Sequence, residues 1–189
     1  ITLAVCILLS LDAGYWFHHR FLHKDLRVTM LDMGQGNAAL LELPKGYCVL
    51  IDGGGFSSNA VFDVGKLIVA PFLWGKKIRT VETLVLSHPH SDHMNGLIYI
   101  AKHFNVKNIW SNNEPCNTKS YAEFIQTIRE KGIAHPSFST IPRRQTINGV
   151  QFHILYPEKN FLPANEKTGS LDNHSLVVRA GLKSISFLF

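Results

Sequence analysis

The stretch Leu86–Gly96, "LSHPHSDHMNG", gathers side chains that commonly bind metals. It holds His88, His90, Asp92 and His93 at H-x-H-x-D-H spacing. Imidazole nitrogen and carboxylate oxygen are ligands that suit zinc, manganese or iron. The stretch contains no cysteine, so it does not predict a closed structural site built from thiolates. The pattern therefore predicts a metal site, and the question it raises is what the metal does.

The residues just before the cluster indicate where the site lies in a fold. "ETLVLSH", residues 82–88, is a continuous apolar run of strand length, which is typical of a strand buried on both faces. His88 ends this run, and α/β sheets usually bind ligands at the carboxyl ends of their strands. Because residues two apart in an extended chain point to the same side, His88 and His90 can converge on one ion. Asp92 and His93 then fall on the following loop or helix start.

The rest of the chain alternates between strand and helix patterns. Strands are predicted where apolar and β-branched residues alternate or run together, and helices where apolar residues recur at helical spacing. The predicted strands lie at 27–32, 37–43, 47–52, 82–88, 106–110, 150–157, 174–180 and 184–189, and the predicted helices within 62–78 and at 92–104 and 119–132. Strands interleaved with helices indicate an α/β layered domain.

The amino-terminal stretch "ITLAVCILLSLDAGYWF" is apolar except for Ser10 and Asp12. As a helix it would span roughly 26 Å, slightly less than a bilayer core of about 30 Å. Its last three residues are aromatic and "HHR" follows, which is how a membrane helix often ends. We interpret residues 1–17 as the end of a transmembrane helix, 18–25 as a linker and 26–189 as the soluble domain. A signal peptide or a buried helix are the alternatives.

Composition limits the class of protein. With 46% hydrophobic and 17% charged residues, the chain can bury a core and is not a disordered protein. A net charge of +5 favours a polyanionic partner such as nucleic acid or an anionic membrane face, although most excess charge of this size is solvated surface. The three cysteines match no disulfide framework, so they do not indicate a compartment.

Three residues outside the cluster are further candidates for the site. Asp52 ends a predicted strand, and we expect its carboxylate to orient a ligand histidine by a hydrogen bond. Asp32 also precedes a glycine-containing turn, where turn chemistry is an equally good explanation. His174, in "LDNHSLVV", is the next candidate ligand, with an exposed loop histidine as the alternative.

Taken together, these motifs resemble a known family. H-x-H-x-D-H after a buried strand, with an upstream strand that ends in Asp-Gly-Gly, is similar to the metallo-β-lactamase fold. "LDMGQG", "VAPFLWGKKIRTVETLVLSHPHSDHMNG" and "DNHSLVV" narrow the resemblance to the soluble domain of ComEC competence proteins. The resemblance covers residues 26–189 and implies an α/β fold, the αββα sandwich, with the metal loop at a sheet edge. It also implies two divalent ions, zinc or manganese, with Asp92 as a catalytic residue.

The same resemblance implies a place and a partner. ComEC proteins form a channel in the bacterial inner membrane that admits single-stranded DNA during natural transformation. Their lactamase-like domain, on the outer (periplasmic) face, is a proposed nuclease for the strand that does not enter. We therefore expect DNA, the inner membrane and the channel part of the same protein as partners. A two-metal site with a basic surround also suits phosphodiester hydrolysis on physical grounds.

Two departures from the family pattern bear on activity. Asn37 stands where the family often has an aspartate after "GQG". The superfamily also completes its site with a bridging aspartate and a final histidine, which we expect beyond Phe189, so we expect the fold to be truncated and this chain alone to bind one metal weakly and to cut DNA poorly or not at all. The alternatives to a nuclease are a small-molecule metallohydrolase acting on lactones or thioesters, and a non-catalytic channel cap.

Overall fold

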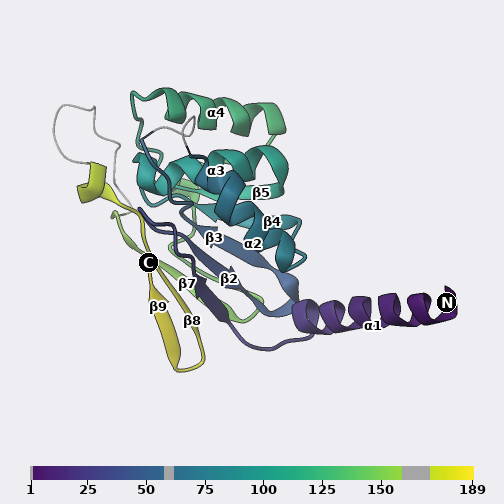
Figure 1. Ribbon diagram of the computed structural model, residues 1–189. Coiled ribbons are helices and arrows are strands. Elements are labelled where there is room, and N and C mark those ends of the chain that lie inside the picture. The colour runs from purple at the N-terminus through teal and green to yellow at the C-terminus, as the bar shows by residue number, and fades with distance from the viewer. Residues whose placement is uncertain (1, 58–61, 159–170) are drawn as a thin grey trace.

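The computed structural model describes residues 2–57, 62–158 and 171–189, which form three layers beside one projecting helix (Figure 1). One sheet has five strands in the order β1-β2-β3-β4-β5, and the other has four in the order β6-β7-β8-β9. The helices α2, α3 and α4 lie together on one side of the five-stranded sheet (Figure 1). The described residues thus form a helix layer and two sheets, as expected for an incomplete αββα sandwich.

The five-stranded sheet is mixed. The antiparallel pairs β1–β2 and β2–β3 form a meander, whereas β3, β4 and β5 are parallel. Its strands are β1 (Arg27–Met30), β2 (Ala39–Glu42), β3 (Cys48–Ile51), β4 (Thr80–Val85) and β5 (Asn105–Trp110). The parallel strands require crossover connections, and these are supplied by the helices. As a result, the carboxyl ends of β3, β4 and β5 lie at the same end of the sheet.

The second sheet is antiparallel throughout. Its strands are β6 (Arg144–Ile147), β7 (Val150–Tyr156), β8 (Val177–Leu182) and β9 (Ile185–Leu188). The pattern in β7 alternates between buried Val150, Phe152 and Ile154 and outward Gln151 and His153. This period of two shows that only one face of the sheet contributes to the core.

The helices form around apolar stripes. A π-helical turn, η2 (Gly65–Val69), continues into α2 (Ala70–Gly75), and the longer helices are α3 (Ser91–His103) and α4 (Lys119–Lys131). Thr118 caps α4 by accepting a hydrogen bond from the Tyr121 backbone N–H, and Gly132 ends it in the left-handed conformation. Short 3-10 turns complete the set: η1 (Pro44–Gly46), η3 (Phe138–Thr140) and η4 (Leu171–His174).

Two hydrophobic clusters hold the layers together. One lies between the helices and the five-stranded sheet, with Leu50, Leu84 and Leu97 fully buried. The other fills the space between the two sheets, where the rings of Trp110 and Phe152 meet edge to face. β3 and β4 contribute to both clusters and are therefore buried on both faces. For β4 this confirms the prediction made from its continuous apolar run.

Most element predictions are confirmed, with corrections at boundaries. Each predicted helix and strand of the domain is present, but β6 was not predicted, and β8 ends at Leu182 rather than at residue 180, so that the turn to β9 lies at Lys183. Lys183 has φ 56°, so a lysine occupies the left-handed position of this turn. Burial raises the pKa of the Cys48 thiol to about 12, which makes it an inert core residue.

The amino-terminal helix α1 (Thr2–Phe21) projects from the domain as a rod, and none of its side chains is buried (Figure 1). It meets the domain at its end, where Phe21 packs against Gly46 and Arg20 donates to the Lys77 carbonyl oxygen. The helix therefore extends four residues into the predicted linker 18–25. Among the described residues, no helix has the length and the hydropathy needed to cross a bilayer, so the prediction that residues 1–17 end a transmembrane helix is not supported.

Candidate metal centre

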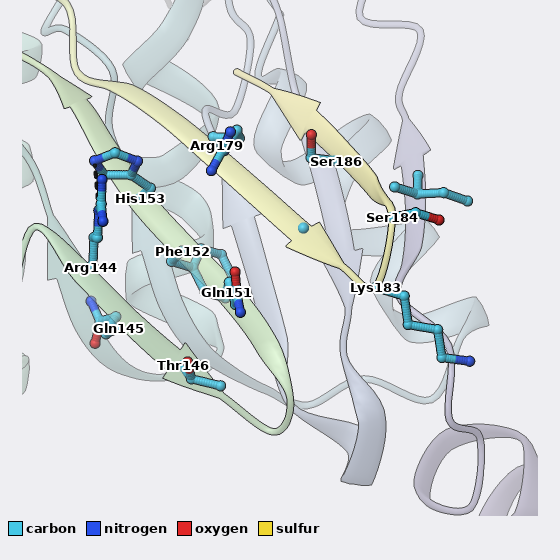
Figure 2. Close-up of a pocket in the computed structure, with 12 residues that line it drawn as sticks. Arg144, Gln145, Thr146, Gln151, Phe152, His153, Arg179, Lys183, Ser184 and Ser186 are labelled. Carbon is cyan, nitrogen blue, oxygen red and sulfur yellow. Dashed lines mark hydrogen bonds between the residues drawn. The ribbon is translucent and has the colours of Figure 1, made fainter.

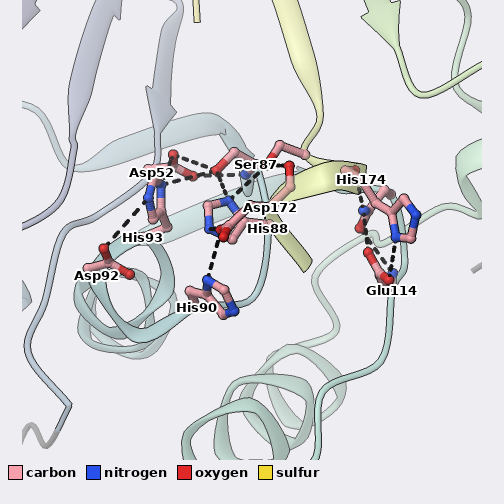
Figure 3. Close-up of polar contacts among 11 residues, drawn as sticks. Asp52, Ser87, His88, His90, Asp92, His93, Glu114, Asp172 and His174 are labelled. Atoms are coloured by element: carbon pink, nitrogen blue, oxygen red, sulfur yellow. Dashed lines mark hydrogen bonds and ion pairs between the residues drawn. The ribbon is translucent and has the colours of Figure 1, made fainter. Parts of the chain in front are cut away.

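The site forms where the carboxyl ends of β3 and β4 meet the start of α3 (Figure 3). The Asp52 backbone N–H donates to the carbonyl oxygen of Val85, the last residue of β4, at 2.8 Å, so the parallel pairing continues one residue past the end of β3. The chain then leaves β4 through Ser87 and His88 and enters α3 at Ser91. This path places all four residues of the H-x-H-x-D-H motif at one sheet end, although β4 is an inner strand of the sheet rather than a lateral edge.

Three side chains form a group that fits a divalent ion. The ligand atoms of His88, His90 and Asp172 all lie within 4.8 Å of one another. The Oδ1 atom of Asp172 is 3.1 Å from His88 Nε2 and 3.0 Å from His90 Nδ1. Atoms bound at 2.0–2.2 Å to a tetrahedral ion are separated by roughly 3.3 Å, so this spacing matches that of ligands around a common ion. Two imidazoles and a carboxylate are also the donor types that such ions accept.

His88 is held so that one ring nitrogen faces the group. Its side chain is 6% exposed, and its Nδ1 atom lies 3.1 Å from Ser87 Oγ and 3.2 Å from Ser175 Oγ. A proton on Nδ1 satisfies either hydroxyl and leaves the Nε2 lone pair directed at the group. Burial and the neighbouring His93 lower the pKa of His88, which favours the neutral ring that a metal requires.

Asp52 orients the ring of His93. The Oδ2 atom of Asp52 is 2.7 Å from His93 Nδ1 and also accepts a bond from the Ser87 hydroxyl, while Oδ1 accepts a bond from the Ser87 backbone N–H. Asp52 is 5% exposed and has φ 55°, a left-handed conformation that aspartate tolerates better than most residues. Burial alone lowers the pKa of His93, but the hydrogen bond and charge of Asp52 outweigh it, and the pKa is raised. The contact is the one expected for a carboxylate that orients a ligand histidine.

Asp92 and His93 lie together beside the first group. The Asp92 Oδ2 atom is 3.9 Å from His93 Nε2, the ring nitrogen that Asp52 leaves free. The rings of His88 and His93 are also close, with centroids 4.1 Å apart. Asp92 sits in the first turn of α3, where the helix dipole favours a carboxylate. Asp92 and His93 thus lie beside the group that His88 and His90 form with Asp172.

Glycines allow the backbone of α3 to pack directly against the segments that follow β1 and β3. A Cβ atom added at Gly96 would lie 1.9 Å from the Gly53 carbonyl oxygen, so no side chain fits there. Gly36, at φ +81°, approaches the Asp92 backbone just as closely. The "GQG" and "DGGG" segments thus carry glycines because two backbones must meet at the start of α3.

The structure places His174 and Asp32 differently from the prediction. His174 Nδ1 lies 2.8 Å from Glu114 Oε1, and its carbonyl oxygen accepts a bond from Asn112 Nδ2. Figure 3 shows this pair apart from the His88 group, where Asp172 stands instead. The Asp32 carboxylate accepts a bond from the Gly34 N–H, which is the turn chemistry considered as its alternative.

Three residues of the site were missed by the sequence reasoning. Asp172 lies two positions before His174 in the same "LDNHSLVV" stretch, and only the fold shows which of the two faces the cluster. Ser87 is inside the motif segment, but a serine carries no signal of its own. Glu114 follows β5 in the loop "SNNEPCN", and the parallel order of β4 and β5 was the signal that could have placed it beside the site.

A hollow of about 440 Å³ opens beside the centre. His90 and Asp92 line it together with Ser57, with further residues around the start of α3 (Pro89, Ser91, Met94 and Asn95), and with residues at and just before the start of α4 (Cys116, Thr118 and Ser120). The larger hollow of about 700 Å³ lies elsewhere, on the second sheet (Figure 2). Because its lining includes His90 and Asp92, the smaller hollow could admit a substrate to the candidate ligands.

Comparisons with known proteins identify the family of this chain. The family profile described as "Metallo-beta-lactamase superfamily" matches residues 31–176. ComE operon protein 3 of Bacillus subtilis is 30% identical over 166 residues, which is 82% of this chain but 21% of that protein. The chain thus spans about a fifth of that relative. A metallo-β-lactamase from Cronobacter sakazakii with a HARLDQ motif has a TM-score of 0.50 at 13% identity, covering 82% of this chain and 52% of its own. The diiron β-hydroxylase CmlA of Streptomyces venezuelae has a TM-score of 0.47 at 14% identity, covering 88% and 29%.

Proposed function

Because this chain belongs to the metallo-β-lactamase superfamily, we propose that it is a metal-dependent phosphodiesterase that cuts DNA. The observation that carries the proposal is the group of His88, His90 and Asp172 with the His93–Asp52 pair beside it. This arrangement offers ligands for one ion and the start of a set for a second. Two ions, zinc or manganese, are the number and kind that we propose for the complete domain.

The positions of the residues suggest which ion each of them would bind. His88, His90 and Asp172 would hold one ion, and Asp92 and His93 would contribute to the other. A divalent ion held there supplies Lewis acidity for a phosphoryl oxygen and a water nucleophile at neutral pH. Asp52 fixes the His93 ring, and Ser87 joins Asp52 to His88. Asp92 faces the hollow that would admit the scissile phosphate, which supports a catalytic role for it.

The choice of DNA rests on likeness of sequence. The resemblance of "LDMGQG" and "DNHSLVV" to ComEC proteins agrees with the 30% identity to ComE operon protein 3. From this we propose that the chain is part of a DNA-uptake protein of the bacterial inner membrane. The domain would then face outward, and its partners would be DNA, the membrane and the channel part of the same protein.

The test measures metal binding and DNA cleavage in the same samples. The chain, and a version extended beyond Phe189, are loaded with Mn²⁺ or Zn²⁺ and incubated with an end-labelled DNA strand. We expect the extended protein to cut the strand, and His88→Ala to reduce both cleavage and metal affinity about 100-fold or more. His103→Ala is the matched control, because His103 is an exposed histidine at the other end of α3.

The outcomes separate the candidate functions. Cleavage that persists in His88→Ala, or an extended protein that binds two metals and leaves DNA intact, would refute the nuclease. In the second case, hydrolysis of a lactone or thioester by the same sample would identify a small-molecule hydrolase. Absence of both activities with full metal occupancy would leave a non-catalytic cap.

A further inference from the structure

The loop that follows β5 is polar in sequence but buried in the structure. Its first four residues, Ser111–Glu114, have the sequence "SNNE", and we call them the SNNE segment. Ser111, Asn112 and Glu114 are 4%, 1% and 5% exposed. Buried polar groups need hydrogen-bond partners, and in this segment the partners alternate along the chain. Ser111 and Asn113 contact the loop after α4, whereas Asn112 and Glu114 contact the turn η4.

One side of the SNNE segment is hydrogen-bonded to His135. Ser111 Oγ and Asn113 Nδ2 lie 2.8 Å and 3.0 Å from the same ring nitrogen, Nε2 of His135. Ser111 Oγ already accepts the Asn113 backbone N–H at 3.1 Å, so its own hydrogen can be donated to the ring. Asn113 Oδ1 accepts the Phe138 backbone N–H, which turns the amide nitrogen towards His135. Two donors to Nε2 require a neutral imidazole with its proton on Nδ1, and burial favours that form by lowering the pKa of His135.

The other side of the SNNE segment holds η4, the turn that carries Asp172. Asn112 Nδ2 donates to the His174 carbonyl oxygen at 2.7 Å, and Asn112 Oδ1 accepts the Glu114 backbone N–H at 3.0 Å. Glu114 Oε1 lies 2.8 Å from His174 Nδ1 (Figure 3). Asn112 thus binds the turn itself and also orients the residue whose carboxylate contacts the His174 ring, so the loss of Asn112 would loosen η4 at both contacts.

The position of η4 decides where the Asp172 carboxylate lies. The Asp172 side chain is 63% exposed, yet its Oδ1 atom is 3.1 Å from His88 Nε2 and 3.0 Å from His90 Nδ1. An exposed side chain keeps one direction only if the backbone that carries it is fixed. Just after η4, the Leu176 N–H donates to the Ser87 carbonyl oxygen at 2.8 Å, which attaches that end of the turn beside His88. The SNNE segment supplies the support on the other side.

We propose that Asn112 and His135 are positioning residues that keep Asp172 in place as a metal ligand. Asn112 acts directly on η4, and His135 acts one step further away by holding the SNNE segment against the loop after α4. The proposal rests on the metal centre of the proposed function, but it does not depend on which substrate is cut. Because His135 belongs to neither the H-x-H-x-D-H motif nor η4, the proposal extends the centre beyond its ligands.

The first measurement is hydrogen exchange in the metal-free chain, in EDTA and mild detergent. The backbone N–H groups of Ser175 and Leu176 donate to the carbonyl oxygens of Asp172 and Ser87, so their exchange reports on η4. We expect Asn112→Ala to speed this exchange about tenfold or more, because the variant leaves a buried carbonyl oxygen without its donor. Amides in the middle of α3 should exchange as in the parent chain.

The second measurement is metal affinity, by calorimetry with Mn²⁺ or Zn²⁺, on the chain and on the version extended beyond Phe189. Outer partners of metal ligands typically contribute 10–100-fold to affinity, so we expect Asn112→Ala to weaken binding by about that factor. His135→Phe keeps a ring but removes the nitrogen acceptor, and its loss should be smaller, about three- to tenfold. His135→Gln offers a carbonyl oxygen in place of Nε2 and should restore the affinity.

Asn148→Ala is the matched control for Asn112→Ala. Asn148 Nδ2 donates to the Pro44 carbonyl oxygen at 2.8 Å, which is the same kind of bond at the opposite end of β3 from Asp52. This variant should leave the exchange at η4 and the metal affinity unchanged. Equal changes in the two variants would reduce the effect to general destabilisation and overturn the proposal, as would parent-like values in Asn112→Ala.

The two His135 variants decide the case if Asn112→Ala does not fold. An equal loss in His135→Phe and His135→Gln, or no loss in either, would overturn the role of His135. If exchange at η4 responds as expected but neither form of the protein binds a metal, the proposed function fails and the hold of the SNNE segment on η4 stands. If each variant binds metal and cuts DNA as the parent does, only the positioning proposal is wrong.

Discussion

Two histidine–carboxylate pairs lie near the candidate metal centre, and they position different parts of it. His93 Nδ1 is 2.7 Å from Asp52 Oδ2, and His174 Nδ1 is 2.8 Å from Glu114 Oε1. Both carboxylates are 5% exposed. In the first pair, the ring of His93 joins the cluster of candidate ligands. In the second pair, the ring of His174 stays outside it, and the neighbour Asp172 joins the cluster instead.

The comparison shows that similar contacts can position a side chain or a segment. Asp52 fixes one imidazole, so its effect is on the direction of a single ring nitrogen. Glu114 and Asn112 hold both the ring and the carbonyl oxygen of His174, so their effect is on the turn η4. Asp172 is carried by that turn, with its side chain 63% exposed. We infer that the second pair keeps an otherwise exposed carboxylate against His88 and His90.

The largest expected effect is on the free energy of unfolding, when the first pair is removed. Asp52→Ala removes the partner of His93 and of two groups on Ser87 in a buried place, and it puts alanine at φ 55°. Breaking a buried charged pair typically costs about 3–5 kcal/mol. We expect urea unfolding of the metal-free chain to show a loss in that range. Asp32→Ala is the control, and we expect about 1 kcal/mol or less because Asp32 is exposed. Equal losses in the two variants would contradict the buried role of Asp52.

A smaller effect is expected from the second pair, and it should appear in metal affinity. Glu114→Gln keeps the shape of the side chain but removes the charge that holds His174. Outer partners of metal ligands typically contribute 10–100-fold to affinity, so we expect Zn²⁺ or Mn²⁺ binding to weaken by about that factor in calorimetry. Glu123→Gln, at an exposed glutamate of α4, should leave the affinity unchanged. Unaltered affinity in Glu114→Gln would show that η4 holds its place without the pair.

The smallest expected effect is a difference in titration between neighbouring rings. In the metal-free chain, the pKa of His93 is raised and that of His88 is lowered from the ordinary value near 6.5. His93 therefore adds stability below pH 6.5 that is lost as pH rises through its folded pKa. His88 does the opposite, and its contribution is lost as pH falls below 6.5. In an NMR titration in EDTA, the His93 ring should therefore titrate at a higher pH than the His88 ring.

Substitution of Asp52 tests the cause of that order. Asp52→Asn keeps a side chain that tolerates the left-handed backbone but removes the charge, so the pKa of His93 should fall. The gap in stability between this variant and the parent chain should be largest below pH 6.5 and should narrow above it. A His93 resonance that titrates at the same pH in both proteins would show that Asp52 does not set its charge.

Local patterns predicted much of the fold and half of the site. The H-x-H-x-D-H spacing and the apolar run before it were sufficient to place His88, His90, Asp92 and His93 at one sheet end. The hydrogen bond of Asp52 to a histidine of the motif was expected from its place at the end of a strand. Asp172 and Glu114 were not placed, because each reaches the site through a contact 60 or more residues distant in sequence. In "LDNHSLVV", a histidine is the more obvious ligand, and only the pairing of His174 with Glu114 shows why the aspartate faces the cluster.

The projecting helix α1 has a practical consequence for work with this chain in water. Leu3, Ile7 and Leu11 are 52–74% exposed, and neighbouring leucines enlarge the apolar surface. Contiguous apolar surface of this kind promotes association between molecules. Copies of the chain should therefore sediment as aggregates in plain buffer and as single molecules in mild detergent. Deletion of residues 2–19 should have the same dispersing effect, since Phe21 on Gly46 and the Arg20 contact with Lys77 would remain.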